Sequence, residues 1–215
     1  MECLKILESL AIIAASVAAV YAISSWRREM KGRKEYELAE KVLALFYEAK
    51  DKISAIRNPF GFLEEGKSRP QLPNETEEQK RARDQAYIVW ERYLKYEDTF
   101  NRLHSLRYRF MAIFGKDKVK PFDDLNEVLQ DLRAAVVMLG HFWYRRTQTH
   151  LPMTEAELTS LNNSIRKYEP VFWEGAESPD SINEKVSAMI LEMEKVCGKI
   201  LKRTKQVSQD SSKIN

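Results

Sequence analysis

The sequence predicts an all-α protein in which a single N-terminal transmembrane helix precedes an antiparallel, four-helix-bundle-like cytoplasmic domain with one extra short helix. Three observations support this prediction. An uncharged run lies beside a basic cluster near the N-terminus, and apolar residues recur at steps of three and four along the rest of the chain. The 215 residues include only seven glycines and seven prolines, too few for the many tight turns of a sheet protein. We expect a membrane anchor with its basic collar at 1–34, a helical bundle domain at 35–203 and a disordered polar tail at 204–215.

The uncharged run from Ser9 to Trp26 has the length of a short membrane span. A helix needs about 20 apolar residues to cross the bilayer core, with a lower limit near 17. Tyr21 and Trp26 lie towards the end of the run, where aromatic rings favour the headgroup level. A buried helix of a soluble protein is the alternative for a run this short. The residues that we expect within the hydrocarbon are Leu10, Ile12, Ile13, Val17, Val20 and Ile23.

The charges beside the span are asymmetric and predict its orientation. Basic flanks stay on the cytoplasmic side, so we expect a single-pass protein of the plasma (inner) membrane, with its N-terminus outside and its body in the cytoplasm. A signal peptide has the reverse order of charges. Each basic residue near an anionic leaflet contributes about 1 kcal/mol of binding, so the collar should contact anionic headgroups. The collar consists of Arg27, Arg28, Lys31, Arg33 and Lys34.

The composition narrows the kinds of partner. The chain has 35 basic and 32 acidic residues. Much of this small excess of positive charge lies in the collar, which leaves the body close to neutral, so we do not expect nucleic acid as a partner. Cys3 and Cys197 fall on opposite sides of the proposed membrane and cannot pair within one chain. Small residues in the span are spaced as in helices that associate in lipid, which leaves a homo-oligomer open.

Proline, glycine and capping residues predict where the helices of the body begin and end. The anchor should continue into a helix that ends before Asn58-Pro59, with Gly32 as a candidate joint. Residues 59–73 should then form a loop. The apolar stripe of the first body helix is Leu38, Val42, Leu45, Ala49, Ile53 and Ile56.

A long helix is predicted after this loop. Asn74 should cap its start, with Glu77 three residues later as in a capping box, and Gly115 should stop it after Phe114. A further helix should open with Pro121 at its first position and fade after Arg146.

Two more helices complete the pattern. Thr154 with Glu157 should cap a short helix that Pro170 ends. The segment 178–180 should start the last helix, which ends near Arg203. Four substantial helices with one apolar face each should form an antiparallel bundle, and their near-heptad spacing predicts coiled-coil-like packing.

The sequence carries no catalytic or metal-binding motif. Di-iron bundles need Glu-x-x-His pairs, but the residues three positions before His104, His141 and His150 are Asn101, Met138 and Thr147. No phosphate-binding glycine loop, Cys-x-x-Cys pair or Gly-x-Ser-x-Gly elbow occurs either. We therefore expect no enzyme and no cofactor, and an enzyme with a site inside the bundle is the least favoured alternative.

Six residues are candidates for binding a partner. Phe60 and Phe62 lie in the predicted loop, where they either fold back on the bundle, which is the commonest outcome, or meet the membrane interface or a partner. Arg107 occupies a position in an apolar stripe, where it either grips an acidic ligand or packs its stem and pairs with an acid from a neighbouring helix. The others, in an aromatic and basic patch, are Tyr144, Arg145 and Arg146.

These features favour a membrane-tethered, non-enzymatic interaction or scaffold protein that presents its cytoplasmic bundle to a protein partner. The alternative is a membrane-acting effector that oligomerises through its transmembrane span.

Overall fold

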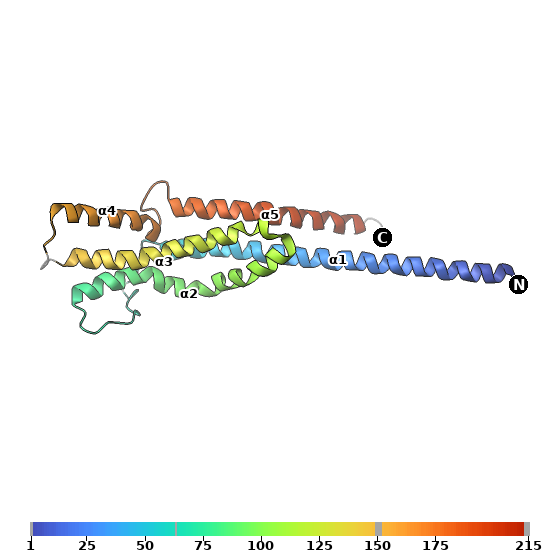
Figure 1. The fold of residues 1–215 in the computed structure, drawn as a ribbon, viewed down its shortest axis with the longest axis horizontal. Helices are drawn as coiled ribbons and strands as arrows, with labels where there is room; N and C mark the ends of the chain where they lie inside the picture. The colour runs from blue at the N-terminus through green and yellow to red at the C-terminus, as the bar shows by residue number, and fades with distance from the viewer. Residues whose placement is uncertain (1, 63, 149–151, 213–215) are drawn as a thin grey trace. The chain divides into compact units, whose positions relative to one another are not determined.

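The computed structural model describes residues 2–62, 64–148 and 152–212, with side chains from residue 10 to residue 202 of these ranges. All regular structure in them is helical, which confirms the all-α prediction. The chain divides into two compact units, Met1–Lys41 with Cys197–Asn215, and Val42–Val196. The helices are α1 (Glu2–Arg57), α2 (Glu77–Phe114), a short 3-10 helix η1 (Lys116–Lys118), α3 (Lys120–Thr147), α4 (Glu155–Phe172) and α5 (Ser181–Ser212) (Figure 1).

The first unit contains the apolar N-terminal part of α1. Within the described residues, α1 is the one helix long and apolar enough to cross a membrane, with a mean hydropathy of 1.5 over its most apolar window. The side chains from Leu10 to Trp26 are all exposed. Helix α1 is unbroken at Gly32, the candidate joint, because a lone glycine costs a helix only about 1 kcal/mol.

The C-terminal end of α1 agrees with the sequence prediction. The helix stops at Arg57, directly before Asn58-Pro59, because a residue before proline is pushed out of the helical region. All six residues of the predicted stripe are buried, so this face contributes to a core: Leu38, Val42, Leu45, Ala49, Ile53 and Ile56.

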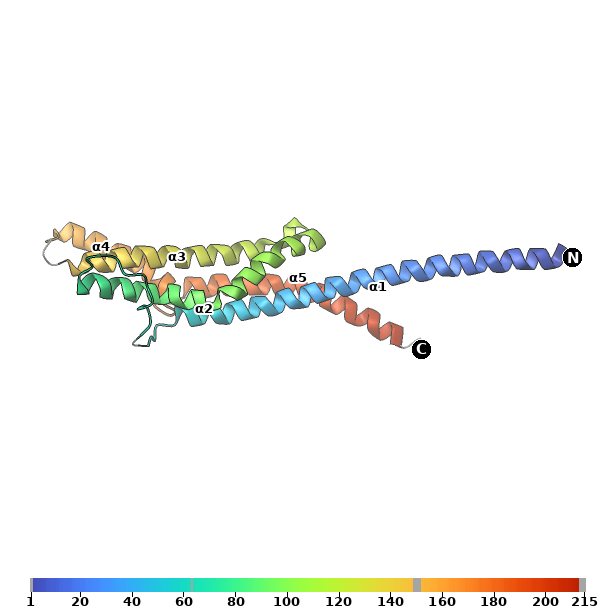
Figure 2. The same ribbon diagram turned by 90° about the horizontal axis from the view of Figure 1, so that it is seen from below.

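In the second unit, α2 and α3 lie side by side and run in opposite directions, and α4 turns back along α3 (Figures 1 and 2). Aromatic rings fill the space between the helices. The ring of Phe122 in α3 contacts Phe46 of α1 with centroids 5.0 Å apart and Phe110 of α2 at 5.4 Å. Edge-to-face and tilted ring pairs of this kind add to the gain from burial alone.

The start of α2 differs from the prediction. Thr76, not Asn74, is the N-cap: its hydroxyl accepts from the backbone N–H of Gln79, and the Gln79 side chain accepts from the N–H of Thr76. Asn74 instead has a φ of 66° and forms part of a turn before the helix. A capping box can use either Glu or Gln at its third position, and the Thr76 box forms. The predicted stop at Gly115 is confirmed.

The limits of the later helices are partly as predicted. The Thr154 capping box is confirmed, but α4 continues through Pro170 to Phe172, so the predicted end was wrong. The last turn past Pro170 keeps a backbone hydrogen bond, from the N–H of Trp173 to the carbonyl of Glu169 at 2.8 Å. Asp180 accepts from the N–H of Asn183 at the start of α5. Helix α5 runs to Ser212, past the expected end near Arg203, and residues 213–215 lie outside the described part.

Candidate functional site

A buried arginine of α2 holds the start of the loop that follows α1. The guanidinium of Arg92 donates to the backbone carbonyls of Asn58 at 2.5 Å and Phe60 at 2.8 Å. It also binds both carboxylate oxygens of Glu65, at 2.6 and 3.1 Å, in the bidentate arrangement that makes the strongest charge-assisted pairs. The hydrogen bond from Arg92 lowers the pKa of Glu65, against the effect of burial. We call residues 58–62, 64 and 65 the clamped loop.

The clamped loop projects two aromatic rings into solvent. Phe60 is 84% exposed and Phe62 is 81% exposed, so the commonest outcome expected for them, folding back on the bundle, is wrong. Each ring follows a backbone that is fixed: the N–H of Phe60 donates to Asn58 Oδ1 at 2.9 Å, and the N–H of Phe62 donates to Glu65 Oε2 at 3.0 Å. These bonds satisfy the loop backbone locally, so burial of the rings is not needed to fix its conformation.

A shallow groove of about 420 Å³ lies beside the clamped loop. Phe60 and Phe62 form one side, and Lys95 and Tyr96 of α2 form another. The groove is open and contains one buried cation, Arg92, which is already engaged by Glu65. The exposed rings, and not an enclosed cavity, are therefore the feature of this region best suited to binding.

The part of the loop that follows the clamped loop, from Gly66 to Glu75, is held to α2 by a separate network of ion pairs. Arg69 binds Glu75 at 2.7 Å and Asp84 at 3.0 Å, and Arg83 binds the other oxygen of Glu75. Gly66 sits so close to α2 that a Cβ there would lie 2.0 Å from the Asp84 carbonyl oxygen, and its φ is 84°, a conformation that glycine adopts at little cost. We call these ion pairs the loop latch.

The loop latch gives a testable pH dependence. Hydrogen bonds from Arg69, and secondarily from Arg83, lower the pKa of Glu75 from 4.5 to about 2. A carboxylate with a lowered pKa stabilises the folded loop above its ordinary pKa, and this contribution is lost as the pH falls from about 4.5 to about 2. In a carboxyl ¹³C NMR titration we expect Glu75 to titrate near 2, and Arg69→Gln to move that midpoint upward. An unchanged midpoint in Arg69→Gln would contradict the assignment.

A second buried arginine joins the end of α1 to the turn between α4 and α5. The Arg57 side chain is 0% exposed. Its guanidinium donates to the carbonyls of Pro170 at 2.7 Å and Val171 at 2.9 Å, and to both oxygens of Asp180 at 2.9 and 3.0 Å. The Arg57 carbonyl accepts from the N–H of Glu174 at 2.7 Å. Arg57 therefore binds the last carbonyls of α4, which a helix leaves unpaired, and makes a structural connection.

Arg107 is also accounted for by a neighbour in the structure. Its guanidinium binds Asp123 of α3 at 2.8 and 3.1 Å, and its side chain is 26% exposed. This is the ion pair with an acid from a neighbouring helix that we weighed against a ligand-binding role. A partly exposed pair of this kind contributes little to stability, about 0–1 kcal/mol.

The three residues of the predicted aromatic and basic patch do not act together. The Tyr144 hydroxyl is bound by the side-chain amides of Gln79 and Gln148, and Arg145 donates to Gln148 at 3.4 Å. Arg146 is exposed and lines a different surface. Tyr144 thus connects the start of α2 to the end of α3 and lines a hollow of about 280 Å³ beside Arg69 and Arg83, away from the surface that Arg146 lines.

That surface is a cleft of about 700 Å³ between the start of α2, the end of α3 and the end of α4, which we call the tryptophan cleft. Trp143 and Trp173 both contact the buried Phe172, with ring centroids 5.4 and 4.4 Å apart and planes nearly perpendicular to it. Aromatic side chains with a few polar groups are typical of binding clefts. The polar lining consists of Glu78, Arg81, Gln85, Arg146, Thr147 and Glu169.

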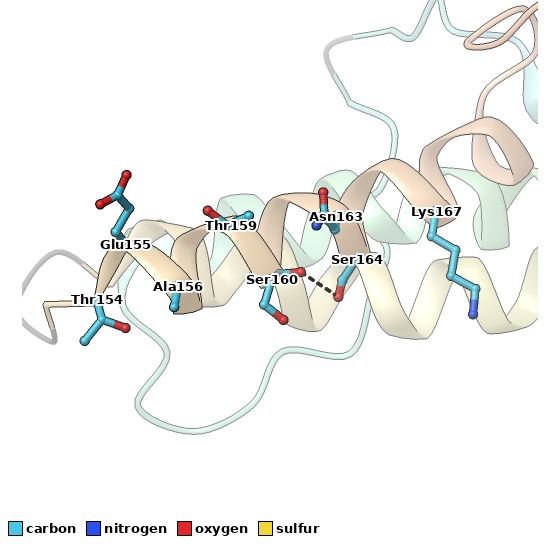
Figure 3. A pocket seen from close by; sticks show the side chains of 8 residues that line it. All are labelled: Thr154, Glu155, Ala156, Thr159, Ser160, Asn163, Ser164 and Lys167. Atoms are coloured by element: carbon cyan, nitrogen blue, oxygen red, sulfur yellow. Dashed lines mark hydrogen bonds between the residues drawn. The ribbon is translucent and has the colours of Figure 1, made fainter.

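A strip of polar side chains on the outer face of α4 forms a further shallow surface (Figure 3). All eight of its residues come from α4 and its N-cap, and the Ser164 hydroxyl donates to the Ser160 carbonyl at 3.0 Å. Among the described residues no second element lines the strip, so it offers neither convergent groups nor an enclosed volume there.

Neither buried arginine was identified from the sequence, although helical spacing carried a signal for both. Arg57 lies four residues after Ile53, and Arg92 lies three residues after Val89, so each extends an apolar stripe by one step. Each was missed because its partners are loop carbonyls and carboxylates whose positions the sequence does not give. Sequence reasoning singled out Arg107 instead, which is more exposed than either.

Two observations bear on chemistry within the described part of the chain. No group of three or more His, Cys, Asp or Glu side chains there is arranged to hold a metal ion. Cys197 is buried, and burial raises the pKa of its thiol to about 12. Since the thiolate is the reactive form, this cysteine is a packing residue in the structure.

In comparisons with known proteins, no family model matches this chain, and no curated protein and no solved structure matches it.

Proposed function

We propose that this is a membrane-tethered, non-enzymatic interaction protein that docks a protein partner through Phe60 and Phe62. The observation that carries the proposal is the clamped loop, in which a buried arginine fixes the backbone while two aromatic rings stay exposed. Aromatic anchors at rigid positions are typical of interface hot spots. A loop ordered before binding loses less conformational entropy when the partner binds.

The tether in this proposal is the span from Leu10 to Trp26 in α1. Its exposed apolar side chains support it, and so do its serines: Ser16 donates to the Ile12 carbonyl and Ser24 to the Tyr21 carbonyl, each at 2.8 Å. Polar groups satisfied within the helix are what a lipid environment requires. The five collar residues are exposed, which supports contact with anionic headgroups at the plasma (inner) membrane, the body being cytoplasmic and the N-terminus outside.

The body in this proposal is an antiparallel four-helix bundle with α4 as the extra short helix. Its support is the pairing of α2 with α3 and the buried stripe of α1. One apolar face of α5 is also buried, at Ile182, Val186, Met189 and Met193. Such a body presents loops at its ends, and the clamped loop is one of them.

The docking role predicts the effect of removing both rings. Because Phe60 and Phe62 are exposed, Phe60→Ser with Phe62→Ser should leave the melting temperature of the detergent-solubilised chain unchanged. Partner recovered after photo-crosslinking from position 64, an exposed position of the clamped loop, should fall at least about tenfold. The matched control is Leu158→Ser, an exposed leucine of α4, which should recover the partner normally. Equal recovery with both variants would refute the docking role.

The tether predicts the effect of a charge in mid-span. An arginine at a helix centre in the bilayer costs about 2.5–3.5 kcal/mol, so Val17→Arg should move a large part of the protein out of the carbonate-washed membrane fraction. Val137→Arg makes the same change at an equally exposed valine of α3 and should stay with the membrane. Wild-type protein that remains soluble without detergent would refute the tether.

The second candidate function is a membrane-acting effector that oligomerises through its span. One observation favours it: the alanines at 11, 15, 18 and 22 are exposed along the span at the spacing that permits close helix approach. Expression would then be toxic with the span intact and harmless with Val17→Arg, whereas the docking protein should be tolerated in both forms.

A further inference from the structure

The second half of the loop displays a proline-rich segment, Arg69-Pro70-Gln71-Leu72-Pro73. Residues 70–73 are all exposed, and Leu72 is 55% exposed. Proline fixes its own φ near −65° and pushes the residue before it towards extended backbone. Two prolines three residues apart therefore favour the polyproline II helix, with three residues per turn. Proteins recognise this P-x-x-P pattern in grooves lined by aromatic side chains.

The tryptophan cleft has the features of such a groove. Trp143 and Trp173 stand on the same Phe172 ring, so their centroids lie within about 10 Å of each other. One turn of polyproline II rises about 9.3 Å, so a segment with prolines at positions i and i+3 is long enough to reach both indole rings within this limit. Arg57 holds the backbone of one of these tryptophan residues, because it donates to the Trp173 carbonyl at 3.3 Å.

The charges of the cleft also favour a peptide of this kind over an anionic ligand. Arg81 and Arg146 line it, but so do Glu78 and Glu169, and the two signs balance. A nucleotide or a phosphorylated peptide would meet both carboxylates and lose much of the attraction of the arginines. A proline-rich segment without charge at its centre meets no such penalty.

We propose that the tryptophan cleft binds the Pro70–Pro73 segment of a second copy of this chain. A chain cannot fill its own cleft, because Arg69 and Glu75 bind the segment at both ends to another face of α2. Figure 1 shows the loop on the side of α2 away from α4, whose end forms part of the cleft.

The segment and the cleft lie on different faces of α2, so the contact is head-to-tail: the segment of one copy enters the cleft of the next. One such junction joins two copies. The inference is independent of Phe60 and Phe62, and it does not require the chain to cross a membrane.

The test is photo-crosslinking of the full chain with p-benzoylphenylalanine in place of Gln71, an exposed residue between the two prolines. The expected product is a covalent dimer whose crosslink maps to Trp143, Trp173 or Gln85 of the other copy. Pro70→Ala with Pro73→Ala should lower the yield at least about tenfold. Ser68→Ala, an exposed change in the same loop, should leave it intact.

A cleft variant tests the other half of the junction. Gln85→Trp adds bulk at an exposed residue of the cleft wall and should abolish the dimer, whereas Gln130→Trp at an exposed position of α3 should not. Mixing the double alanine variant with Gln85→Trp leaves one junction intact, so crosslinking from the Gln85→Trp copy to the alanine copy should return. No dimer product, a crosslink elsewhere or a product with a different protein would overturn the assignment.

Discussion

Replacing Arg57 with alanine is expected to lower the free energy of unfolding by about 3–5 kcal/mol, the cost of removing one partner from a buried ion pair. Arg57 is fully buried, and its loss leaves the carbonyls of Pro170 and Val171 without this donor. It also removes the ion pair of the Asp180 carboxylate, which keeps the N–H groups of Gly175 and Asn183. Burial raises the pKa of Asp180, but hydrogen bonds, first among them that from Arg57, outweigh this effect and hold the pKa below its ordinary value.

Thermal unfolding of the full chain in detergent, followed by near-UV circular dichroism, measures this loss. For a domain of this size it corresponds to a fall in melting temperature of roughly 10 °C or more. Arg107→Ala is the matched control, because it removes an arginine that binds an aspartate at a similar distance but is partly exposed. Its effect should stay below about 1 kcal/mol. Equal effects of the two variants would refute the structural role of Arg57.

Replacing Arg92 with alanine is expected to open the clamped loop. The variant leaves the carbonyls of Asn58 and Phe60 without this donor and removes the ion pair of Glu65, which keeps the N–H of Phe62. Unlike the partners of Arg57, these groups can reach water if the loop moves, so the loss of stability should be about 1–3 kcal/mol. The larger effect should be local: chymotrypsin should cut after Phe60 or Phe62 at least about tenfold faster.

Two variants test whether the clamped loop needs the bidentate geometry of the guanidinium or only a positive charge. Arg92→Lys keeps the positive charge but cannot make the bidentate pair with Glu65, so its cleavage rate should lie between those of the wild type and the alanine variant. Arg102→Ala removes an exposed arginine of the same helix, 3.7 Å from Asp98, and should leave cleavage unchanged. A loop equally resistant in Arg92→Ala would show that other contacts hold it.

The elements that sequence reasoning located correctly are those determined by neighbouring residues. Pro59 ends α1, Gly115 ends α2 and Thr154 caps α4 through interactions that span a few positions. Pro170 failed as a stop signal for α4, and the carbonyls of Pro170 and Val171 in the turn that continues past it are bound by Arg57, which lies more than a hundred residues away. A local rule cannot include a partner at that separation.

In the candidate site, too, sequence reasoning identified local features and missed contacts between distant residues. The sequence singled out Phe60 and Phe62 as apolar residues in a loop but gave no reason why they should stay exposed. That reason is Arg92, which fixes the loop by bonds to its carbonyls and not by burial of its rings. The tryptophan cleft was missed because Trp143 and Trp173 come from different segments and are brought together by Phe172.

The position of Arg57 in the chain also has a consequence for biosynthesis. The ribosome makes Arg57 more than a hundred residues before its side-chain partners, which in the described part of the chain lie between Pro170 and Asn183. Until that region is translated, the guanidinium lacks these native acceptors, so the interior around it stays hydrated. The nascent body therefore completes its core only after this region has been made.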